Sequence, residues 1–232
     1  MYGLSMWGFD PLFLILVVPT FIFTIWAQFK VKGSFNKFSK VRTSNGLTGA
    51  QAAAEILRNA GINDVRIEQT PGHLSDHFDP RGNVIRLSES VYNAATVAAV
   101  GVAAHEAGHA IQHAHGYSPM KIRAAIIPVT NIGSKLAMPL IFMGLILNMF
   151  GLVNLGIILF GTLVVFQLVT LPVEFNASNR AIAALRGCNM LNADELRGSQ
   201  KVLTAAALTY VAALAMSIAQ MLRFILIALR RR

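Results

Sequence analysis

Long apolar stretches alternate with polar ones along the chain. The first covers residues 11–29, where only three uncharged polar side chains interrupt the apolar run. A helix needs roughly 20 such residues to cross a bilayer, so this stretch predicts a membrane span. Two further blocks, residues 136–150 and 155–171, flank an uncharged, turn-like segment at 151–154 and predict a hairpin of membrane helices.

The last apolar block has two interpretations. Residues 202–229 are interrupted by Gln220 and Arg223, and three arginines follow. Strict alternation of the spans places this basic tail outside, against the preference of basic residues for the cytoplasmic side. Either the tail is an exception, or the segment bends back near Gln220.

Charges around the first block predict its orientation. Five basic residues follow it between Lys30 and Arg42, whereas only Asp10 precedes it. Because basic residues favour the cytoplasmic side, we expect the N-terminus outside and the polar stretches in the cytoplasm.

Polar residues are concentrated at 33–120 and 172–201. In the first stretch, apolar residues at helical spacing follow Thr48 and stop at Gly61, which predicts a short capped helix. Residues 65–67 then alternate in the manner of a strand.

A second strand and a long helix are expected further along. The turn-rich cluster at 79–83 precedes an apolar run at 84–87, which reads as a short strand. Ser88 or Ser90 can then cap a long helix that runs into the segment holding His105.

Composition supports a membrane protein and restricts the chemistry. The chain is 54% hydrophobic and only 13% charged, below the roughly 25% charged residues of soluble proteins. The net charge of +9 accompanies apolar stretches and no aromatic-interleaved patch, which favours lipid head groups over nucleic acid as partners. Since Cys188 is alone, metal binding must use His and carboxylate.

One short motif carries chemistry. His105, Glu106 and His109 form HExxH within a predicted helix, where residues four apart lie on one face and can bind one metal ion. Zinc suits such a site, and Glu106 can act as general base toward zinc-activated water. The alternative is an amphipathic helix that carries these residues by chance.

Catalytic zinc takes three protein ligands, and Glu174 is the candidate for the third. It is the only acidic residue between His109 and Asp194, and it directly follows a predicted membrane helix. A metal would offset the cost of a carboxylate so close to hydrocarbon. Pairing with Arg180 is the simpler alternative.

Other histidines are weaker candidates. His73, Asp76, His77 and Asp79 could bind a second metal, but their spacing matches no metal template, and a turn stabilised by these side chains is favoured. His77 could instead donate a hydrogen bond to the oxyanion of the reaction.

Two more histidines follow the motif. His113 lies one further turn along the same face, and His115 lies beyond it. A fourth ligand would close the site to water, so roles beside the ligands or toward solvent are favoured for both.

Three segments resemble the YugP-like membrane zinc metallopeptidases. They are HEAGHAIQH at 105–113, LSDHFDPRGNVIRLS at 74–88 and LPVEFNASNRA at 171–181, and the resemblance covers nearly the whole chain.

More distantly, HExxH with a later ExxA segment resembles the HtpX and CAAX-prenyl-protease type of gluzincin. That resemblance implies His105, His109 and Glu174 as zinc ligands and Glu106 as the base. Those relatives carry Asp where this chain has Ser178, which puts support of a ligand histidine from this position in doubt; Asn176 or Asn179 could substitute.

In such peptidases an edge strand beside the zinc commonly holds the extended substrate. We assign this role to Val84, Ile85, Arg86 and Leu87, with an ordinary structural strand as the alternative.

Together these observations predict a mostly α-helical integral membrane protein with three or four transmembrane helices. A small zincin-like cytoplasmic metalloprotease domain would contain the short edge strand. The expected order is an N-terminal transmembrane helix at 1–32, a catalytic region with the HExxH helix at 33–120, a transmembrane hairpin at 121–171, a third-ligand helix and loop at 172–201, and a C-terminal transmembrane segment with a basic tail at 202–232.

The predicted function is that of a zinc-dependent endopeptidase of a bacterial-type cell membrane. Its site would face the cytoplasm near the bilayer surface and cleave membrane or membrane-associated proteins or peptides. A homo-oligomer or a regulatory membrane partner is left open. The rival is a non-catalytic zinc-binding scaffold or assembly factor, against which Glu106 argues, because a structural site needs no carboxylate between its histidines.

Overall fold

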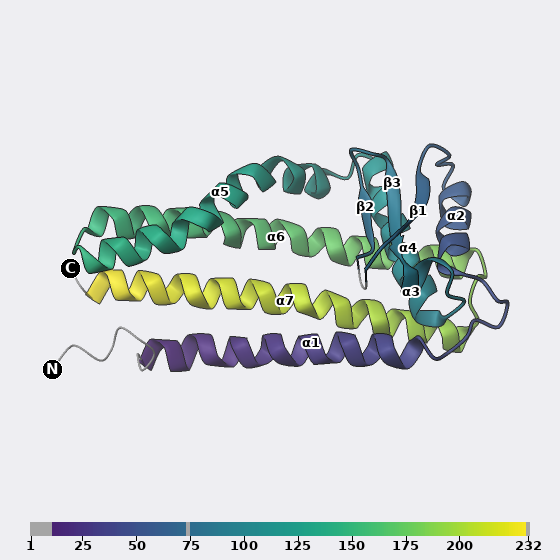
Figure 1. Ribbon diagram of the computed structural model, residues 1–232, viewed down its shortest axis with the longest axis horizontal. Helices are drawn as coiled ribbons and strands as arrows, with labels where there is room; N and C mark the ends of the chain where they lie inside the picture. Colours follow the sequence, from purple (N-terminus) through teal and green to yellow (C-terminus); the bar gives the residue numbers. More distant parts are fainter. Residues whose placement is uncertain (1–10, 73–74, 231–232) are drawn as a thin grey trace. The chain divides into compact units, whose positions relative to one another are not determined.

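The computed structural model describes residues 11–72 and 75–230, and most of them are helical (Figure 1). The elements in chain order are η1 (Phe13–Val17), α1 (Val18–Phe38), α2 (Gly49–Asn59), β1 (Arg66–Thr70), β2 (His77–Asp79), β3 (Val84–Ser88), α3 (Glu89–Tyr92), α4 (Val97–Ala114), α5 (Ser118–Ile146), α6 (Phe150–Gly187) and α7 (Ala193–Arg230). The predicted fold class, mostly helical with a short strand component, is confirmed.

The chain forms two compact units. The first, here the helical unit, comprises Met1–Gln28, Lys121–Leu171 and Thr209–Arg232. The second, here the sheet unit, comprises Phe29–Met120 and Pro172–Leu208. The long helices α1, α6 and α7 contribute residues to both units.

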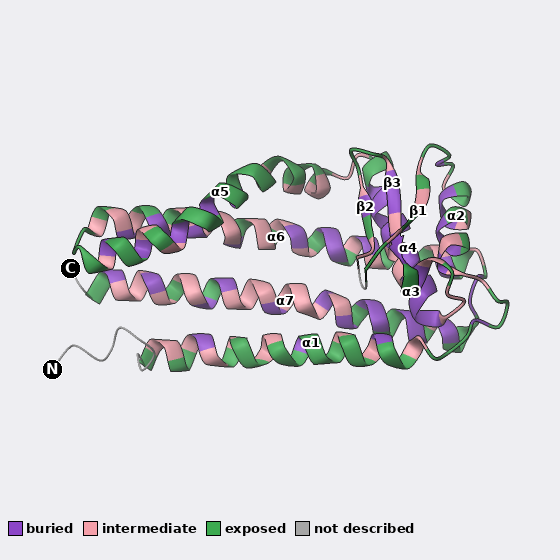
Figure 2. Ribbon diagram, in the orientation of Figure 1, coloured by how far each residue is buried: buried purple, intermediate pink, exposed green. Residues whose placement is uncertain are grey.

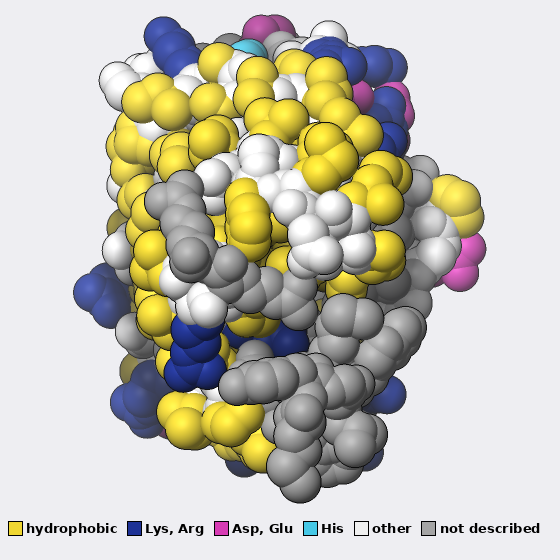
Figure 3. Space-filling model, turned by 90° about the vertical axis from the view of Figure 1, so that its left-hand side faces the viewer, with side chains coloured by type: hydrophobic (Ala, Val, Ile, Leu, Met, Phe, Trp, Pro, Cys, Tyr) yellow, Lys and Arg dark blue, Asp and Glu magenta, His cyan; other side chains and the backbone are white. Residues whose placement is uncertain are grey.

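Four helices of the described chain are long and apolar enough to cross a membrane. They are Phe13–Phe38, Ser118–Ile146, Phe150–Gly187 and Ala193–Arg230. Many of their large apolar side chains are exposed, which a soluble protein would avoid, and hydrophobic side chains cover most of the coloured surface in Figure 3. Exposed residues also cover much of α1 and α5 in Figure 2. These features are those of a membrane protein.

Glycines bring α5 and α6 together within the helical unit. A Cβ at Gly156 would lie 2.6 Å from Cγ1 of Ile141 and 2.9 Å from the carbonyl of Ala137, and one at Gly133 would lie 2.5 Å from Thr162 Oγ1. Small residues of this kind let membrane helices approach closely, because no side chain separates their backbones.

One expectation about this unit is wrong, and one of the two interpretations of the last apolar block is excluded. The turn of the hairpin comprises residues 147–149, before the predicted 151–154, because Asn148 takes the positive φ (53°) that asparagine tolerates. Helix α7 continues unbroken past Gln220. No Gly or Pro interrupts residues 202–230, and the Arg223 guanidinium lies over the Phe13 ring, so the polar pair does not force a bend.

The sheet unit holds a three-stranded sheet with the order β1-β3-β2 (Figure 1). Strand β3 pairs in parallel with β1 and antiparallel with β2. Val84, Ile85 and Leu87 are fully buried, as the concentration of buried residues on β3 and α4 in Figure 2 illustrates. The predicted strand therefore exists, but its predicted edge role is wrong. Both sides of β3 are occupied, and the edge nearer the HExxH helix belongs to β2, which contacts α4.

The start of α2 agrees with the prediction from the sequence, whereas the start of the helix that carries HExxH does not. Thr48 caps α2 through a capping box with Gln51, and Gly61 follows the helix at φ 71°, as predicted. The helix expected from Ser88 or Ser90 is instead split into α3 and α4, and Thr96 caps the second.

Long-range pairing explains this break between α3 and α4. The amide of Thr43 donates to Ala95, the amide of Val97 donates to Val41, and Arg42 forms an isolated bridge with Thr96. These contacts hold residues 94–96 outside either helix, with Thr96 extended, which an uninterrupted helix would exclude.

Candidate metal centre

The two histidines of HExxH lie on α4, a helix packed among small side chains. Ala103, Ala104 and Ala107 are fully buried in the main core of the sheet unit. His105 and His109 are one turn apart, and their ring centroids are 4.7 Å apart. The helical spacing read from the sequence therefore places both imidazoles on one face.

Glu174 on α6 completes the group. Its side chain is almost fully buried, and Oε2 lies 3.3 Å from Nε2 of His105 and 3.6 Å from Nε2 of His109. Among the residues that the structure describes, these three form the single group whose ligand atoms could hold one metal ion, all within 4.8 Å of one another.

The donor set fits zinc. Two atoms bound to a tetrahedral zinc ion at about 2.0–2.1 Å lie about 3.3–3.4 Å apart, close to the separations found here. Two imidazole nitrogens and one carboxylate are also the ligand types of catalytic zinc sites, which leave one position open.

The approach of α4 to α6 depends on Gly108. A Cβ at this position would lie 2.5 Å from the carbonyl oxygen of Ala177, closer than real Cβ contacts. The absent side chain lets the segment that carries Glu174 come close to the histidines. The sequence showed this glycine only as a small residue within the motif.

Each histidine has a hydrogen-bond partner at its other ring nitrogen. Nδ1 of His105 lies 3.1 Å from Ser178 Oγ, and Nδ1 of His109 lies 3.0 Å from Gln112 Oε1. Both histidines therefore direct Nε2 toward Glu174. Such contacts fix the ring orientation of metal-binding histidines.

The support for His105 comes from Ser178 itself, so the doubt about this position is resolved. The suggested substitutes do not replace it: Asn176 accepts a hydrogen bond from Gln112, and Asn179 is exposed. Arg180, the alternative partner of Glu174, instead donates from Nε to Asn176. Gln112 was missed from the sequence, although its position three residues after His109 was a usable signal.

The surroundings of His109 favour positive charge. Burial alone would lower its pKa, but the adjacent carboxylate of Glu174 and the charge of Glu106 outweigh burial and raise the pKa above its usual value. The negative field that favours a proton here also favours a metal cation.

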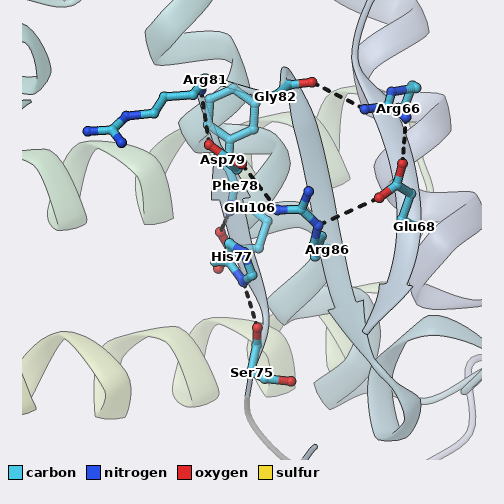
Figure 4. Close-up of polar contacts among 10 residues, drawn as sticks. All are labelled: Arg66, Glu68, Ser75, His77, Phe78, Asp79, Arg81, Gly82, Arg86 and Glu106. Carbon is cyan, nitrogen blue, oxygen red and sulfur yellow. Dashed lines mark hydrogen bonds and ion pairs between the residues drawn. The ribbon is translucent and has the colours of Figure 1, made fainter. Parts of the chain in front are cut away.

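Glu106 is held by the edge strand. Its side chain is largely buried, and Oε2 accepts a hydrogen bond of 2.9 Å from the main-chain amide of Phe78 on β2. Figure 4 shows Glu106 beside this strand. One carboxylate oxygen is thus fixed by backbone, which holds the group next to the histidine pair.

The predicted substrate residue Arg86 ties the sheet together. Its guanidinium lies 3.1 Å from Asp79 on β2 and 3.6 Å from Glu68 on β1, so one side chain links all three strands (Figure 4). The pKa of Asp79 is lowered, first by the amide of Arg81 and then by Arg86. Arg86 therefore crosslinks the sheet.

His77 lies on β2 and is exposed. Its Nδ1 is 2.8 Å from the carbonyl of Ser75, and because a carbonyl only accepts, Nδ1 carries the proton. A neutral His77 then has no proton on Nε2, so donation to an oxyanion would require the imidazolium form.

The two aspartates of the remaining polar cluster have different hydrogen-bond partners. Asp76 accepts hydrogen bonds from the amide and hydroxyl of Ser88, and Asp79 accepts one from the amide of Arg81. His73 lies outside the described residues. The predicted turn therefore describes Asp79, whereas Asp76 joins the segment before β2 to Ser88 at the end of β3.

The two histidines after the motif are both exposed and stand apart from the ligand group. The ring of His113 lies 5.7 Å from that of Phe78, and Nδ1 of His115 lies 3.5 Å from Arg180.

A largely buried His₂Glu group with an adjacent glutamate, in a chain with four apolar helices, matches the class of membrane zinc peptidases. Comparison with known proteins places the chain within it. Residues 13–229 match the family described as "Putative neutral zinc metallopeptidase", and the chain belongs to this family.

A protein of Bacillus subtilis (strain 168), "Putative membrane protease YugP", is 48% identical over 222 residues, which cover 95% of this chain and 98% of that protein. The resemblance read from the three motifs is therefore confirmed. No solved structure matches the chain.

Proposed function

We propose that the protein is a zinc-dependent endopeptidase that hydrolyses peptide bonds of membrane or membrane-associated proteins. The observation that carries the proposal is the convergence of His105, His109 and Glu174 beside the buried carboxylate of Glu106. The family and the bacterial relative named above support the reaction class.

Each residue has a defined part in this proposal. His105 and His109, through Nε2, and Glu174 would hold the metal, which when bound supplies a Lewis acid that lowers the pKa of water. Glu106 would take a proton from the attacking water and pass it to the leaving amine. The amide of Phe78 keeps one oxygen of Glu106 in place, so the other is available for the proton.

The free edge of β2 suggests how a substrate could be held. The N–H and C=O of one strand residue point to the same side, so the carbonyl of Phe78 faces the side of Glu106. An extended peptide could donate a hydrogen bond to this carbonyl, because β3 already occupies the other side of the strand.

Chain connectivity supports membrane-associated substrates. Glu174 lies on α6, three residues after the apolar block that ends at Leu171. A ligand so near a membrane helix favours a site close to the bilayer surface. The many basic residues of the sheet unit suit anionic head groups.

The test measures zinc content and cleavage of unfolded casein, and self-cleavage, by detergent-purified protein. Wild type should hold about one zinc ion and cleave. Glu106→Gln should keep zinc and lose about 100-fold or more of the rate, whereas Glu174→Ala should lose zinc. Glu89→Gln, the same change at an exposed glutamate, serves as control and should match wild type.

The opposite result is equally clear. If wild type holds zinc but Glu106→Gln equals it in every cleavage assay, the peptidase proposal fails. A zinc-binding scaffold would then describe the protein.

A further inference from the structure

Gln112 is a fully buried amide in contact with a proposed metal ligand. It follows His109 by three residues on α4, and its side chain has no exposed surface. A glutamine is rarely buried completely, and each of its polar atoms then needs a partner.

The partners of Gln112 determine which way its amide faces. The atom 2.8 Å from the carbonyl of Val173 must be the Nε2 donor, because a carbonyl only accepts. The second Nε2 proton goes to Oδ1 of Asn176, at 3.0 Å. That oxygen is identified independently, because Arg180, which can only donate, approaches it at 2.7 Å through Nε.

Oε1 of Gln112 is therefore left to face Nδ1 of His109. Since Oε1 only accepts, Nδ1 must carry a proton, and in the neutral imidazole the lone pair of His109 then lies on Nε2, which faces Glu174. This is the tautomer that a metal ligand needs.

The same amide links the two segments that supply ligands. Val173, whose carbonyl it binds, directly precedes Glu174 on α6, while His109 lies on α4. One buried side chain thus contacts both the ring of His109 and the backbone next to Glu174. The hydroxyl of Ser178 at His105 can donate or accept and does not impose a tautomer.

We infer that Gln112, held in turn by Asn176 and Arg180, is the positioning residue that presets His109 as a metal ligand. The inference rests on the proposed zinc site and adds a neutral amide relay to it. Its loss should weaken zinc binding about 10-fold to 100-fold, the usual effect of removing such a partner.

The test uses competition with a chromophoric chelator to measure the zinc Kd of detergent-purified protein. Gln112→Met, similar in size but without an amide, should raise Kd about 10-fold to 100-fold and change the visible spectrum of bound Co²⁺. Ser199→Ala is the control, because Ser199 is equally buried but bonds Val97, away from the ligands. It should lower the Tm of the metal-free protein and leave Kd unchanged.

A second pair of variants changes Asn176, which is less buried than Gln112. This pair tests the positioning role if Gln112→Met does not fold. Asn176→Ala removes the acceptor and should raise Kd about 3-fold to 10-fold. Asn176→Asp keeps an acceptor oxygen for both Gln112 and Arg180 and should restore the wild-type Kd.

The possible failures can be told apart. If wild type binds no zinc, the proposed function and this inference both fail. If wild type binds zinc and cleaves while Gln112→Met and Asn176→Ala bind zinc equally well, only the positioning role is overturned. A control variant with the same loss of affinity as Gln112→Met would also overturn it, since general destabilisation would then explain the effect.

Discussion

At the scale of single residues, backbone groups and neutral side chains hold the reactive groups in place. Glu106 is held by the amide of Phe78, and the two histidines are held by Ser178 and Gln112. Among the described residues, no carboxylate is hydrogen-bonded to Nδ1 of His105 or His109. The charge near the metal group therefore comes mainly from Glu174 and Glu106.

The backbone contact of Glu106 can be removed selectively. Phe78→Pro deletes the amide proton at a position whose N–H does not pair with β3, where an edge strand tolerates proline. We expect kcat to fall about 10-fold to 100-fold with zinc content unchanged, because the base is no longer held. Phe78→Ala, which keeps the amide, should lose much less, and an equal loss in both variants would assign the effect to the ring.

At the scale of elements, the site depends on how closely two helices approach. Helix α4 carries two of the proposed ligands and α6 carries the third, and their backbones meet where Gly108 faces the carbonyl of Ala177. Sheet order matters as much, because it leaves β2 as the strand beside Glu106.

Gly108→Ala should separate these helices. The added Cβ meets backbone at 2.5 Å, which cannot rotate away, so we expect a destabilisation of about 1–3 kcal/mol and at least about a 10-fold weaker zinc affinity. Gly101→Ala, on the same helix, meets Ser199 at 3.2 Å and should change zinc affinity little. Calorimetric titration with zinc distinguishes the two, and equal affinities would contradict the close-approach argument.

At the scale of the whole molecule, four candidate spans connect two units of different character. The basic residues that follow α1 predict a cytoplasmic sheet unit. With four spans, the turn between α5 and α6 should then lie on the opposite side. The C-terminal end of α7, with Arg230, would lie on that side too, against the usual rule.

Cysteine labelling tests this topology. Cys188→Ser removes the single native cysteine, and Ala54→Cys on exposed α2 or Met149→Cys in the exposed turn adds a new one. An impermeant maleimide should label Met149→Cys on intact cells and Ala54→Cys only after permeabilisation. The reverse pattern would place the sheet unit outside.

The sequence by itself determined the local features of this protein. Hydropathy located the apolar helices, and helical spacing placed His105 and His109 on one face, because both depend on neighbours along the chain. The cap at Thr48 and the stop at Gly61 followed for the same reason. Glu174 could be proposed as a partner because acidic residues are scarce and the later motif resembles a known family.

Tertiary structure decided what depends on contacts between distant segments. The edge position went to β2 and not to residues 84–87, because strand order is set by pairing with β1. The break between α3 and α4 came from pairing with residues 41–43. The role of Gln112 became visible only when Val173 and Asn176 were placed beside it, since an amide's function depends on the partners that surround it.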